Sequence, residues 1–420
     1  MNILNRRLFD QAVSVTTQLL MFAQPADAVL SAFFRAQKCG PRERALIAET
    51  AYAVLRHKRS LAAWLGPDAN TKQLVLAAMV RYGGMSQRQL SEGLAPRDAE
   101  WVAQLKGRPE PTLSLAEQTD LPDWLVERLR GMMDEPQLLE LARALNQPAP
   151  LDLRVNTLKA ERDAVLAQLT ADGIAAQVCP YAPDGIRTAG KPFVANEPLF
   201  LDGHIEVQDE GSQLLGHLLQ PKRGEMVVDF CAGAGGKTLL LGALMRSTGR
   251  LYAFDVADKR LAKLKPRLAR SGLSNVHPIA IAHENDTHVK RLAGKCDRVL
   301  VDAPCSGLGT LRRNPDLKWR QSPQSVAELT VKQASILAAA SKLLKPGGRL
   351  VYATCSLLPE ENEGIVDAFL AAHPQFARVS AKSVLAAQGI AVDLSGDDLH
   401  LLPHVHGTDG FYAAVLERAA

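Results

Sequence analysis

From about residue 206 to the end of the sequence, short apolar runs alternate with longer segments of helical periodicity. The runs have the composition and length of β-strands, and they are EMVVDFCA, GRLYAFDVA, VHPIAIA, CDRVLVDAP, GGRLVYATCS and FYAAVLER. Strands that are separated by helices pair into a mostly parallel sheet with helices on both faces. Ligands of such sheets bind at the carboxyl ends of the strands, near the point where the strand order reverses. We therefore predict an α/β fold whose functional residues follow the strands.

Two other regions precede this pattern, as expected for a chain of 420 residues, which exceeds one ordinary domain. Residues 1–140 have helical periodicity, for example in ERALIAETAYAVLRHKRSLAAWL and DWLVERLRGMMDEPQLLELARALN, and Pro41 and Pro122 are typical of helix starts. NQPAP at 146–150 has the composition of a linker, and a strand-like and a helical segment follow it. We predict three domains: an all-helical domain at 1–140, a small α+β module at 145–205 and the α/β domain at 206–420.

The N-terminal segment shares one feature with signal peptides, because Asn5-Arg6-Arg7 precedes an apolar stretch. Polar residues interrupt that stretch and its apolar residues recur at helical spacing, so we predict an amphipathic helix instead. With 47% apolar and 22% charged residues and no apolar run of membrane-spanning length, the sequence predicts a soluble protein. The six cysteines form no Cys-x-x-Cys pair, which predicts reduced cytoplasmic thiols and no metal site. We also expect a monomer.

Charge is unevenly distributed along the first 140 residues. Residues 1–90 carry 12 Lys/Arg and 5 Asp/Glu, a net charge of +7, whereas residues 91–140 carry 5 and 11, a net charge of −6. The basic stretch includes Arg42, Arg44, Arg56, Lys58 and Arg59. A basic face of this kind suits contacts with nucleic-acid phosphates, although a solvated helix face has the same composition.

The stretch VVDFCAGAGGKT at 227–238 ends like a phosphate-binding loop. The Walker A pattern, however, requires a glycine where this sequence has Cys231. A dinucleotide fingerprint is also incomplete, because Gly233 and Gly235 are followed directly by Gly236. The pattern is therefore a glycine turn after a strand, without the residues that bind phosphates.

Acidic residues after the next three strands extend the predicted cofactor site. Asp255 lies about 20 residues after the loop, where a carboxylate accepts hydrogen bonds from ribose hydroxyls. Asp286 follows the third strand, where an adenine edge can be read, and Asp302 ends the fourth. A ribose-binding acid without phosphate machinery favours S-adenosylmethionine; the alternatives are a nicotinamide cofactor or a turn that needs glycine only for packing. The predicted cofactor contacts are Cys231, Ala232, Gly233, Ala234, Gly235, Gly236, Lys237, Asp255, Asp286 and Asp302.

Two cysteines follow neighbouring predicted strands, Cys305 in VDAPCSGLG and Cys355 in VYATCS. They are either buried structural residues or a reactive pair beside the cofactor. A thiolate that adds to C6 of a pyrimidine makes C5 nucleophilic enough to attack a methylsulfonium, and it leaves again when the C5 proton is taken. Asp302 is placed to bind the N3/N4 edge of cytosine, which must leave its stack or arrive single-stranded. The pair therefore favours methylation of cytosine C5.

The residues around Cys305 support the same chemistry. In GTLRRNPDLKW, Arg312, Arg313 and Lys318 are candidates for holding an RNA backbone, and Trp319 for base stacking or simply for packing. Enzymes of this fold that methylate amino groups usually have Asn/Asp-Pro-Pro-Tyr where this sequence has Asp-Ala-Pro-Cys. That departure favours methylation of carbon.

These residues resemble the Nop/Sun family of RNA cytosine-5 methyltransferases, and its bacterial Sun/Fmu branch in particular. Asp-Ala-Pro-Cys-Ser-Gly stands at 302–307, Arg-Arg-x-Pro-Asp-x-Lys-Trp at 312–319, Thr-Cys-Ser at 354–356 and Asp-Gly-Phe at 409–411. LRVNTLK and QDEGSQL are similar to the family's preceding module, and residues 1–140 resemble the RNA-binding helical domain related to the antitermination factor NusB. The resemblance implies a class I, Rossmann-like S-adenosylmethionine methyltransferase that acts on one cytosine of 16S ribosomal RNA.

The resemblance also implies separate roles for the two thiols. Cys355 would be the nucleophile and Cys305 would help to release the product, whereas DNA cytosine-5 methyltransferases attack with the Pro-Cys thiol. One departure concerns the cofactor loop, which in the family is Cys-Ala-Ala-Pro-Gly-Gly-Lys. Here Gly233 and Ala234 replace alanine and proline, so we expect a looser loop and weaker cofactor affinity.

Three alternatives accompany this interpretation. The first is cytosine-5 methylation of another RNA. The second is a DNA methyltransferase, against which the N-terminal region and the Thr-Cys-Ser motif argue. The third is a non-catalytic RNA-binding or ribosome-assembly factor, against which the presence of both thiols, Asp302 and Lys237 argues.

Overall fold

The computed structural model describes residues 4–420, and the chain divides into two compact units. Unit 1 consists of the N-terminal residues through Pro148 together with Thr310–Pro323. Unit 2 consists of Ala149–Gly309 and Gln324–Ala420. Among the described residues, no helix combines the length and the apolar composition needed to cross a membrane.

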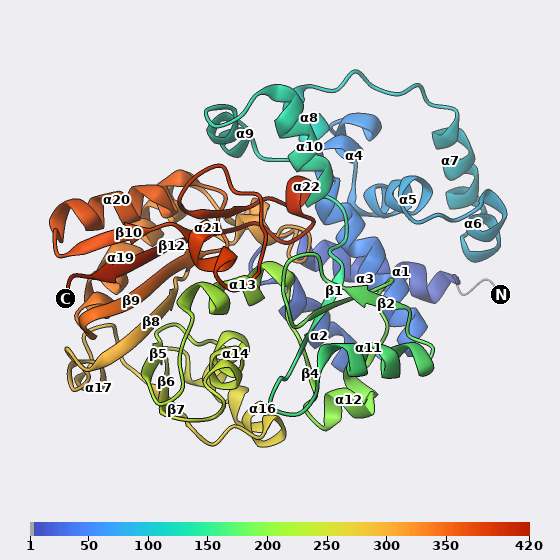
Figure 1. Cartoon of the computed structure of the whole chain (residues 1–420). Helices are drawn as coiled ribbons and strands as arrows, with labels where there is room; N and C mark the ends of the chain where they lie inside the picture. Colours follow the sequence, from blue (N-terminus) through green and yellow to red (C-terminus); the bar gives the residue numbers. More distant parts are fainter. Residues whose placement is uncertain (1–3) are drawn as a thin grey trace. The chain divides into compact units, whose positions relative to one another are not determined.

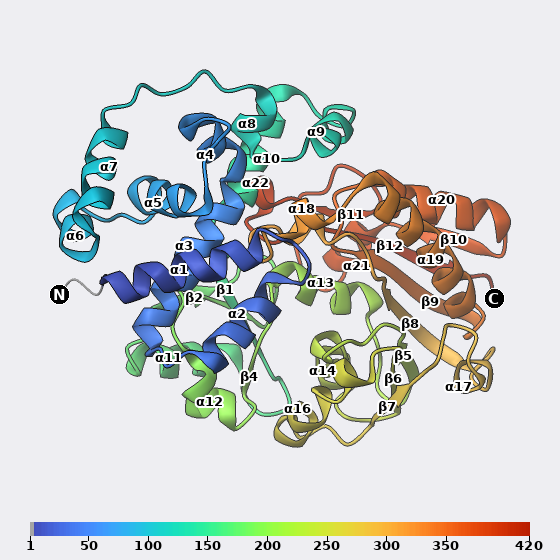
Figure 2. The ribbon, with the colours of Figure 1, turned by 180° about the vertical axis from the view of Figure 1, so that it is seen from behind.

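The first part of unit 1 is helical, as its periodicity predicts (Figures 1 and 2). Pro41 is the first residue of one helix and Pro122 is the N-cap of another, so both predicted starts are confirmed. The predicted amphipathic N-terminal helix is also confirmed. The helices are α1 (Arg6–Leu19), α2 (Ala26–Ala36), α3 (Pro41–Arg56), α4 (Lys58–Leu65), α5 (Thr71–Arg81), α6 (Gln87–Gly93), α7 (Pro96–Lys106), α8 (Leu115–Thr119), α9 (Asp123–Arg130) and α10 (Glu135–Leu145).

Each of the two long helical stretches quoted from the sequence contains a break. His57 separates α3 from α4, and the start of α4 is capped by Asp120, a residue distant in sequence. The Asp120 carboxylate accepts hydrogen bonds from the backbone N–H groups of Arg59 and Ser60, both at 2.9 Å. These are two of the donors that every helix leaves unpaired in its first turn. Local periodicity predicts the helices but not a break that a distant carboxylate stabilises.

The segment Thr310–Pro323 belongs to unit 1, although it follows a strand of unit 2 in sequence. Lys318 of α18 (Leu317–Arg320) is 1% exposed, and its Nζ donates to the Arg56 carbonyl at 2.7 Å and to Asn146 Oδ1 at 2.9 Å. Trp319 Nε1 donates to the Leu55 carbonyl at 2.8 Å. The prediction that Lys318 holds RNA is therefore wrong, because its ammonium group is buried and paired inside the unit. Of the two alternatives for Trp319, packing is the one observed.

Unit 2 begins with a small α+β module. Its antiparallel sheet has the order β2-β3-β1-β4, with Leu153 opposite Ile186 and Val207. One face of this sheet packs on a helix through a cluster that includes Leu153, Val165, Leu169 and Ile186. The strands are β1 (Leu151–Val155), β2 (Ala176–Val178), β3 (Gly185–Thr188) and β4 (Ile205–Val207), and the helices are α11 (Arg162–Ala171) and α12 (Pro198–Leu201), with a 3₁₀ turn η1 (Val194–Asn196).

The rest of unit 2 is built on a mostly parallel sheet of order β10-β12-β9-β8-β5-β6-β7, with β11 paired to β12 (Figures 1 and 2). All six predicted strands are present, and β10 and β11 are additional. The chain runs outward from β5 to β7 and then returns to β8 on the other side of β5, so the strand order reverses between β5 and β8. The strands are β5 (Met226–Asp229), β6 (Arg250–Asp255), β7 (Val276–Ala280), β8 (Cys296–Asp302), β9 (Leu344–Thr354), β10 (Phe376–Val379), β11 (Leu399–Leu401) and β12 (Phe411–Arg418).

Helices cover both faces of this sheet, as the strand–helix alternation predicts. Side chains of α13 (Glu210–Leu219), α14 (Gly236–Leu244) and α21 (Ala381–Ala386) pack with Leu300 and Val351 on one face. Side chains of α19 (Pro323–Ser341) and α20 (Glu363–Ala372) pack with Val299 and Leu350 on the other. Consecutive strand residues thus enter opposite cores, which is why these strands are apolar throughout. The remaining helical segments are α15 (Asp258–Leu261), α16 (Leu264–Ser271), α17 (Thr287–Lys290), α22 (Pro403–His406) and the 3₁₀ turns η2 (Leu308–Thr310) and η3 (Pro359–Glu361).

Candidate functional site

A cavity of about 510 Å³ lies at the carboxyl ends of the parallel strands of unit 2. Its lining includes residues that follow β5, β6, β8 and β9, on both sides of the point where the strand order reverses. A volume of this size suits a nucleoside-sized ligand. The strand-end rule therefore located the cavity correctly from the sequence.

The glycine loop follows β5 and leads into α14. Gly233 has φ +56° and Gly235 has φ +82°, a left-handed backbone that other residues adopt only with strain. A Cβ atom at Gly233 would meet no atom within 4 Å, whereas one at Gly235 would lie 2.2 Å from Leu264. Gly233 thus leaves backbone open toward the cavity, and Gly235 allows the tight packing that starts α14. Gly235 itself does not line the cavity; the other residues of 231–237 do.

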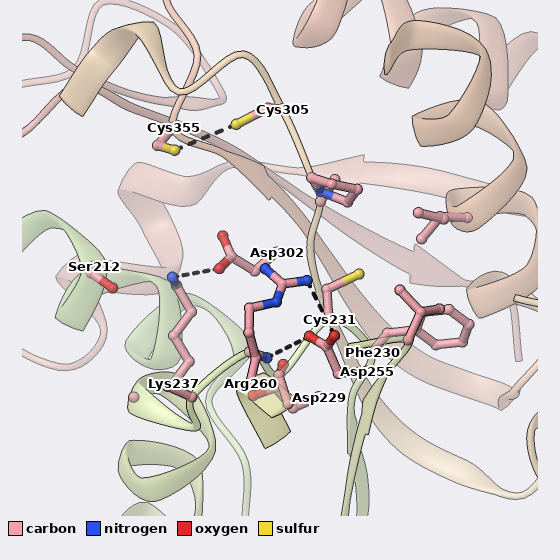
Figure 3. Close-up of a pocket in the computed structure, with 18 of the residues that line it drawn as sticks. Ser212, Asp229, Phe230, Cys231, Lys237, Asp255, Arg260, Asp302, Cys305 and Cys355 are labelled. Atoms are coloured by element: carbon pink, nitrogen blue, oxygen red, sulfur yellow. Dashed lines mark hydrogen bonds and ion pairs between the residues drawn. The ribbon is translucent and has the colours of Figure 1, made fainter. Parts of the chain in front are cut away.

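Asp229 and Asp255, at the ends of β5 and β6, bring carboxylates to the cavity. Asp255 Oδ2 accepts a hydrogen bond from the Gly233 N–H at 2.8 Å, and its Oδ1 lies 3.1 Å from Arg260 Nη2 (Figure 3). Asp229 Oδ2 accepts from the Thr238 hydroxyl at 2.6 Å, while its Oδ1 has no hydrogen-bond partner among the described residues. Burial raises the pKa of Asp229 to about 7. The buried, partly unsatisfied carboxylate suits a cationic ligand group.

Asp302, at the end of β8, forms an ion pair with Lys237 of the glycine loop, with 2.7 Å between Oδ2 and Nζ (Figure 3). Burial acts to lower the pKa of Lys237, but the Asp302 carboxylate and the neighbouring Cys355 raise it overall. Lys237 is therefore a cation in the cavity wall. The Asp302 side chain is 28% exposed, so part of its carboxylate remains open to a ligand.

The two thiols predicted as a reactive pair lie side by side. Cys305 Sγ and Cys355 Sγ are 3.4 Å apart, point toward each other and both line the cavity (Figure 3). The hydrogen bond with Cys355, burial and the charge of Glu361 raise the pKa of Cys305. Cys305 therefore holds its proton strongly.

Asp286 is the one predicted carboxylate that does not line the cavity. It is the N-cap of α17, where its side chain accepts hydrogen bonds from the N–H groups of Ala282 at 3.0 Å and His288 at 2.8 Å. These hydrogen bonds hold the pKa of Asp286 well below its usual range. Glu284, two residues earlier, does line the cavity, and its Oε1 accepts from the Ser335 hydroxyl at 2.5 Å. No local sequence pattern distinguishes Glu284 from Asp286 in AHEND, because only the turn before α17 determines which of the two side chains faces the cavity.

Comparison with known proteins agrees with this geometry. A family model described as 16S rRNA methyltransferase RsmB/F matches residues 216–417, and one described as a RsmF/B-like ferredoxin-like domain matches residues 121–194. The probable ribosomal RNA small subunit methyltransferase B of Synechocystis sp. is 38% identical over 308 residues, covering 73% of this chain and 69% of that protein. The chain belongs to the RsmB/F family of 16S rRNA methyltransferases. A second relative, from Bacillus subtilis and with the same description, is 29% identical and covers 93% of this chain and 94% of its own length.

Solved structures support the fold assignment. The crystal structure of PH0851 has a TM-score of 0.80 at 27% identity and covers 100% of both chains. A methyltransferase homologue from Pyrococcus horikoshii has a TM-score of 0.62 at 30% identity and covers 72% of this chain and 97% of its own. This RsmB/F protein is thus a class I, Rossmann-like methyltransferase that acts on ribosomal RNA, and S-adenosylmethionine is its methyl donor.

The cavity suits that donor. A positively charged sulfonium and amino group favour surroundings with carboxylates, and Asp229, Asp255 and Asp302 supply them. The open backbone at Gly233 allows close approach to a ligand.

Two arginines that the sequence interpretation did not single out hold the backbone of the glycine loop. Arg154 of β1 donates to the Gly236 carbonyl at 2.7 Å, and Arg267 of α16 donates to the Ala234 carbonyl at 2.6 Å. Arg154 is 2% exposed, and burial lowers its pKa to about 10. The motif LRVNTLK contains Arg154, but only the fold brings its guanidinium group to the loop.

One cluster outside the cavity has side chains that metals favour, Asp152, Cys179 and Glu210. The Arg187 guanidinium group lies between the two carboxylates, at 2.7 Å from Asp152 and 3.3 Å from Glu210. Arg187 therefore neutralises these acids directly. The absence of a metal site remains a prediction.

Proposed function

We propose that this RsmB/F protein methylates C5 of a cytosine in 16S ribosomal RNA through a covalent bond between Cys355 and C6 of the base. The observation that carries the proposal is the pair of sulfur atoms 3.4 Å apart in the wall of the cofactor cavity. Methylation of a nitrogen or oxygen needs no thiol, because those atoms are themselves nucleophilic. A pyrimidine C5 becomes nucleophilic only after addition at C6.

In this mechanism the Cys355 thiolate forms the bond to C6, and the electron pair of the C5–C6 double bond becomes available at C5. When bound, S-adenosylmethionine supplies an electrophilic methyl group, which C5 accepts. A base then takes the C5 proton, the electron pair of the C5–H bond restores the C5–C6 double bond, and the bond between C6 and sulfur breaks. The thiolate of Cys355 is thereby regenerated, and the free enzyme is ready for the next cycle.

The electrostatics of the thiol pair support different roles for its members. Cys305 keeps its proton, for which the hydrogen bond with Cys355 is the largest cause. Lys237, which pairs with Asp302, and Cys355 line the same cavity. We therefore assign the attack to Cys355 and a function in product release to Cys305. Asp302 is assigned to the N3/N4 edge of the cytosine and to the cofactor site.

For the cofactor we propose contacts from the residues of 231–237 other than Gly235, and from Asp255 and Asp302. Asp255 is assigned to the ribose hydroxyls. For the adenine edge we propose Glu284 rather than Asp286, because the Asp286 carboxylate already caps α17.

We propose that the helical region 1–140 is a NusB-like RNA-binding domain and that 145–205 and 206–420 form the other two domains. Two adjoining hollows in the helical region share Gln37 and Lys38 and also contain Arg6, Arg7, Arg35 and Arg44. This arrangement of basic side chains around a hollow complements an RNA phosphate backbone. We also propose that the protein is a cytoplasmic monomer, which is consistent with ribosomal RNA as its substrate.

Methyl transfer from labelled S-adenosylmethionine to 16S ribosomal RNA, followed by digestion to nucleosides and mass spectrometry, tests the reaction. We expect 5-methylcytidine in RNA treated with the wild-type protein and none after treatment with Cys355→Ser. Label in another nucleoside would contradict C5 methylation. Tight RNA binding without label in any RNA would favour the non-catalytic alternative.

A further inference from the structure

Each of the two cysteines is followed by a serine, and both serines bind one buried carboxylate, that of Glu361 in η3. Oε1 accepts a hydrogen bond from the Ser306 N–H at 2.8 Å, and Oε2 accepts from the Ser306 hydroxyl at 2.5 Å. The Ser356 hydroxyl donates to the same Oε2, and the two serine oxygens are 3.2 Å apart. The side chain of Glu361 is completely buried. One carboxylate thus connects the two chain segments that carry the thiols.

The segment around Cys305 is fixed on both sides of the cysteine. Gln333 of α19 donates through Nε2 to the Pro304 carbonyl at 3.0 Å and to Glu361 Oε1 at 2.9 Å. Glu361 holds the next residue, Ser306, through both its N–H and its hydroxyl. The position of the Cys305 sulfur therefore depends on Glu361 and on a glutamine that Glu361 itself binds.

The segment around Cys355 is fixed by the same turn. Asn362, which follows Glu361, accepts a hydrogen bond from the Thr354 hydroxyl at 2.5 Å and donates to the Ser356 carbonyl at 3.2 Å. The Cys355 carbonyl accepts from the Gly309 N–H at 2.8 Å, which ties it directly to the other segment. Residues 361–362 thus hold the chain on both sides of Cys355 and after Cys305, and the residue before Cys305 is held by Gln333, which binds Glu361.

Glu361 accepts four hydrogen bonds from hydroxyl, amide and backbone donors. That is the bonding pattern of an ionised carboxylate. Its charge also contributes to the raised pKa of Cys305, after the hydrogen bond with Cys355 and burial. A completely buried carboxylate is expensive in free energy unless donors compensate it, so a group of this kind indicates a specific requirement at this point.

We propose that Glu361 is a positioning residue that sets the separation of the Cys305 and Cys355 sulfurs by binding Ser306 and Ser356 at once. The catalytic consequence rests on the proposed function, in which both thiols act on the same cytosine. The geometric consequence does not, because the distance between the sulfurs can be measured without any methyl transfer. In catalysis, a displacement of about 1 Å of a reacting group costs on the order of a hundredfold in rate.

Phenylarsine oxide tests the proximity of the two thiols, because its arsenic forms two As–S bonds with neighbouring thiols and releases one water, without oxidation. The rate of this bridging reaction depends on the effective concentration of one thiol at the other. Intact-protein mass spectrometry follows the reaction, and peptide mapping locates it. The Cys305→Ser variant of the full chain lacks one thiol of the pair, so any arsenic that it binds gives the background reaction of the other cysteines.

We expect Glu361→Ala to slow bridging about tenfold or more, because the effective concentration of the second thiol falls. The same variant should lower kcat for methyl transfer while leaving KM for S-adenosylmethionine unchanged. Glu361→Gln should keep the bridging rate and kcat close to those of wild type. Its amide oxygen accepts a hydrogen bond from the Ser306 N–H, and its amide nitrogen donates to the serine hydroxyls, which can rotate. Glu361→Asp, one methylene shorter, cannot reach both serines and should behave like the alanine variant.

The control is Asp398→Asn, which alters another buried carboxylate of unit 2, one that accepts a hydrogen bond from Tyr412 at 2.6 Å and contacts neither thiol segment. It should lose thermal stability and bridge at the wild-type rate, so that lost stability alone does not explain slow bridging. Wild-type bridging in a folded Glu361→Asp or Glu361→Ala protein would overturn the proposal. If wild type bridges the two thiols at the expected rate but methylates no RNA, the proposed function is overturned. The role of Glu361 in positioning the two sulfurs would still stand.

Discussion

Gly309 illustrates how closely the chain segments of the thiol site approach one another. Its N–H donates to the Cys355 carbonyl at 2.8 Å, and its own carbonyl accepts from the Gly410 N–H at 2.8 Å. A Cβ atom at Gly309 would lie 2.3 Å from the Gly410 carbonyl oxygen and 2.9 Å from the Cys355 carbonyl oxygen. Both neighbours are backbone atoms, which cannot move aside without shifting a whole segment. Gly309 and Gly410 are therefore needed for close packing beside the thiols.

Replacing Gly309 with alanine should consequently damage both stability and catalysis. We expect Gly309→Ala to destabilise unit 2 by about 1–3 kcal/mol, the usual cost of overpacking, and to lower kcat through displacement of Cys355. Urea unfolding and methyl-transfer kinetics measure the two effects. Gly396→Ala is the matched control, since a Cβ there meets no atom within 4 Å. Equal stability and activity of the two variants would contradict the packing argument.

Residues that line the cavity could be predicted from the sequence where they follow a strand. Asp255, Asp302, Cys305 and Cys355 all lie on the cavity because parallel strands present their carboxyl ends at one edge. Glu361 could not be predicted, since its partners come from three separate segments that only the fold brings together.

Among the structural elements, the glycine loop at 231–237 is held more firmly than its composition suggests. Gly233 and Ala234 stand where the family has alanine and proline, yet Asp255 binds the Gly233 N–H and Arg267 binds the Ala234 carbonyl. Whether the substitution weakens cofactor binding remains a prediction. These contacts stabilise the observed conformation of the loop, whereas proline would act by reducing the number of alternative conformations.

Titration calorimetry on Ala234→Pro tests the loop directly. Among the described residues the Ala234 N–H donates no hydrogen bond, so proline removes none. Restricting the loop by about 0.4–1 kcal/mol should tighten S-adenosylmethionine binding roughly two- to fivefold. Unchanged affinity would mean that the existing contacts already fix the loop.

The segment Thr310–Pro323 is the element for which the sequence was most misleading. Its basic and aromatic residues have the composition of an RNA contact, but Lys318 and Trp319 bind backbone carbonyls of α3. Sequence composition does not distinguish a lysine that is exposed to solvent from a lysine that is buried and hydrogen-bonded. Only the contacts of Lys318 with Arg56 and Asn146 do.

Burial lowers the pKa of Lys318 to about 7, which makes its effect on stability depend on pH. An unfolded lysine titrates near ~10.4, so between pH 7 and ~10 the unfolded chain binds more protons than the folded one. The stability of wild type should therefore rise with pH in this window relative to Lys318→Met, by at most about 1.4 kcal/mol per pH unit. Urea unfolding of both proteins at pH 7, 8 and 9 provides the difference. A difference that does not change with pH would contradict a proton-linked buried lysine.

For the whole molecule, periodicity predicted the two architectures of the chain, helices first and then a doubly covered parallel sheet. It did not predict that a segment inserted after β8 would join the helical unit, because sequence order alone does not show which core a short segment enters. Charge patterning likewise indicated a basic N-terminal region, while the hollows around Lys38 depend on the packing of α1, α2 and α3.

The proposed RNA surface can be tested by charge reversal in the full chain. Arg35→Glu and Lys38→Glu should each weaken RNA binding and reduce the slope of log K against log salt by about 1 per lost phosphate contact. Affinity for S-adenosylmethionine should not change. Lys106→Glu, at an exposed position of α7, is the control and should have little effect. Equal losses of RNA affinity in all three variants would indicate an effect of net charge rather than a specific RNA-binding surface.

Trapping of the covalent protein–RNA adduct tests the central claim most directly. Cys305→Ser and Cys355→Ser proteins are incubated with 16S ribosomal RNA and S-adenosylmethionine, and adducts are separated on a denaturing gel. Accumulation of adduct by Cys305→Ser and its absence from Cys355→Ser is the predicted result, since Cys355 attacks and Cys305 acts in release. Adduct formed by Cys355→Ser and not by Cys305→Ser would reverse the two roles and contradict the account.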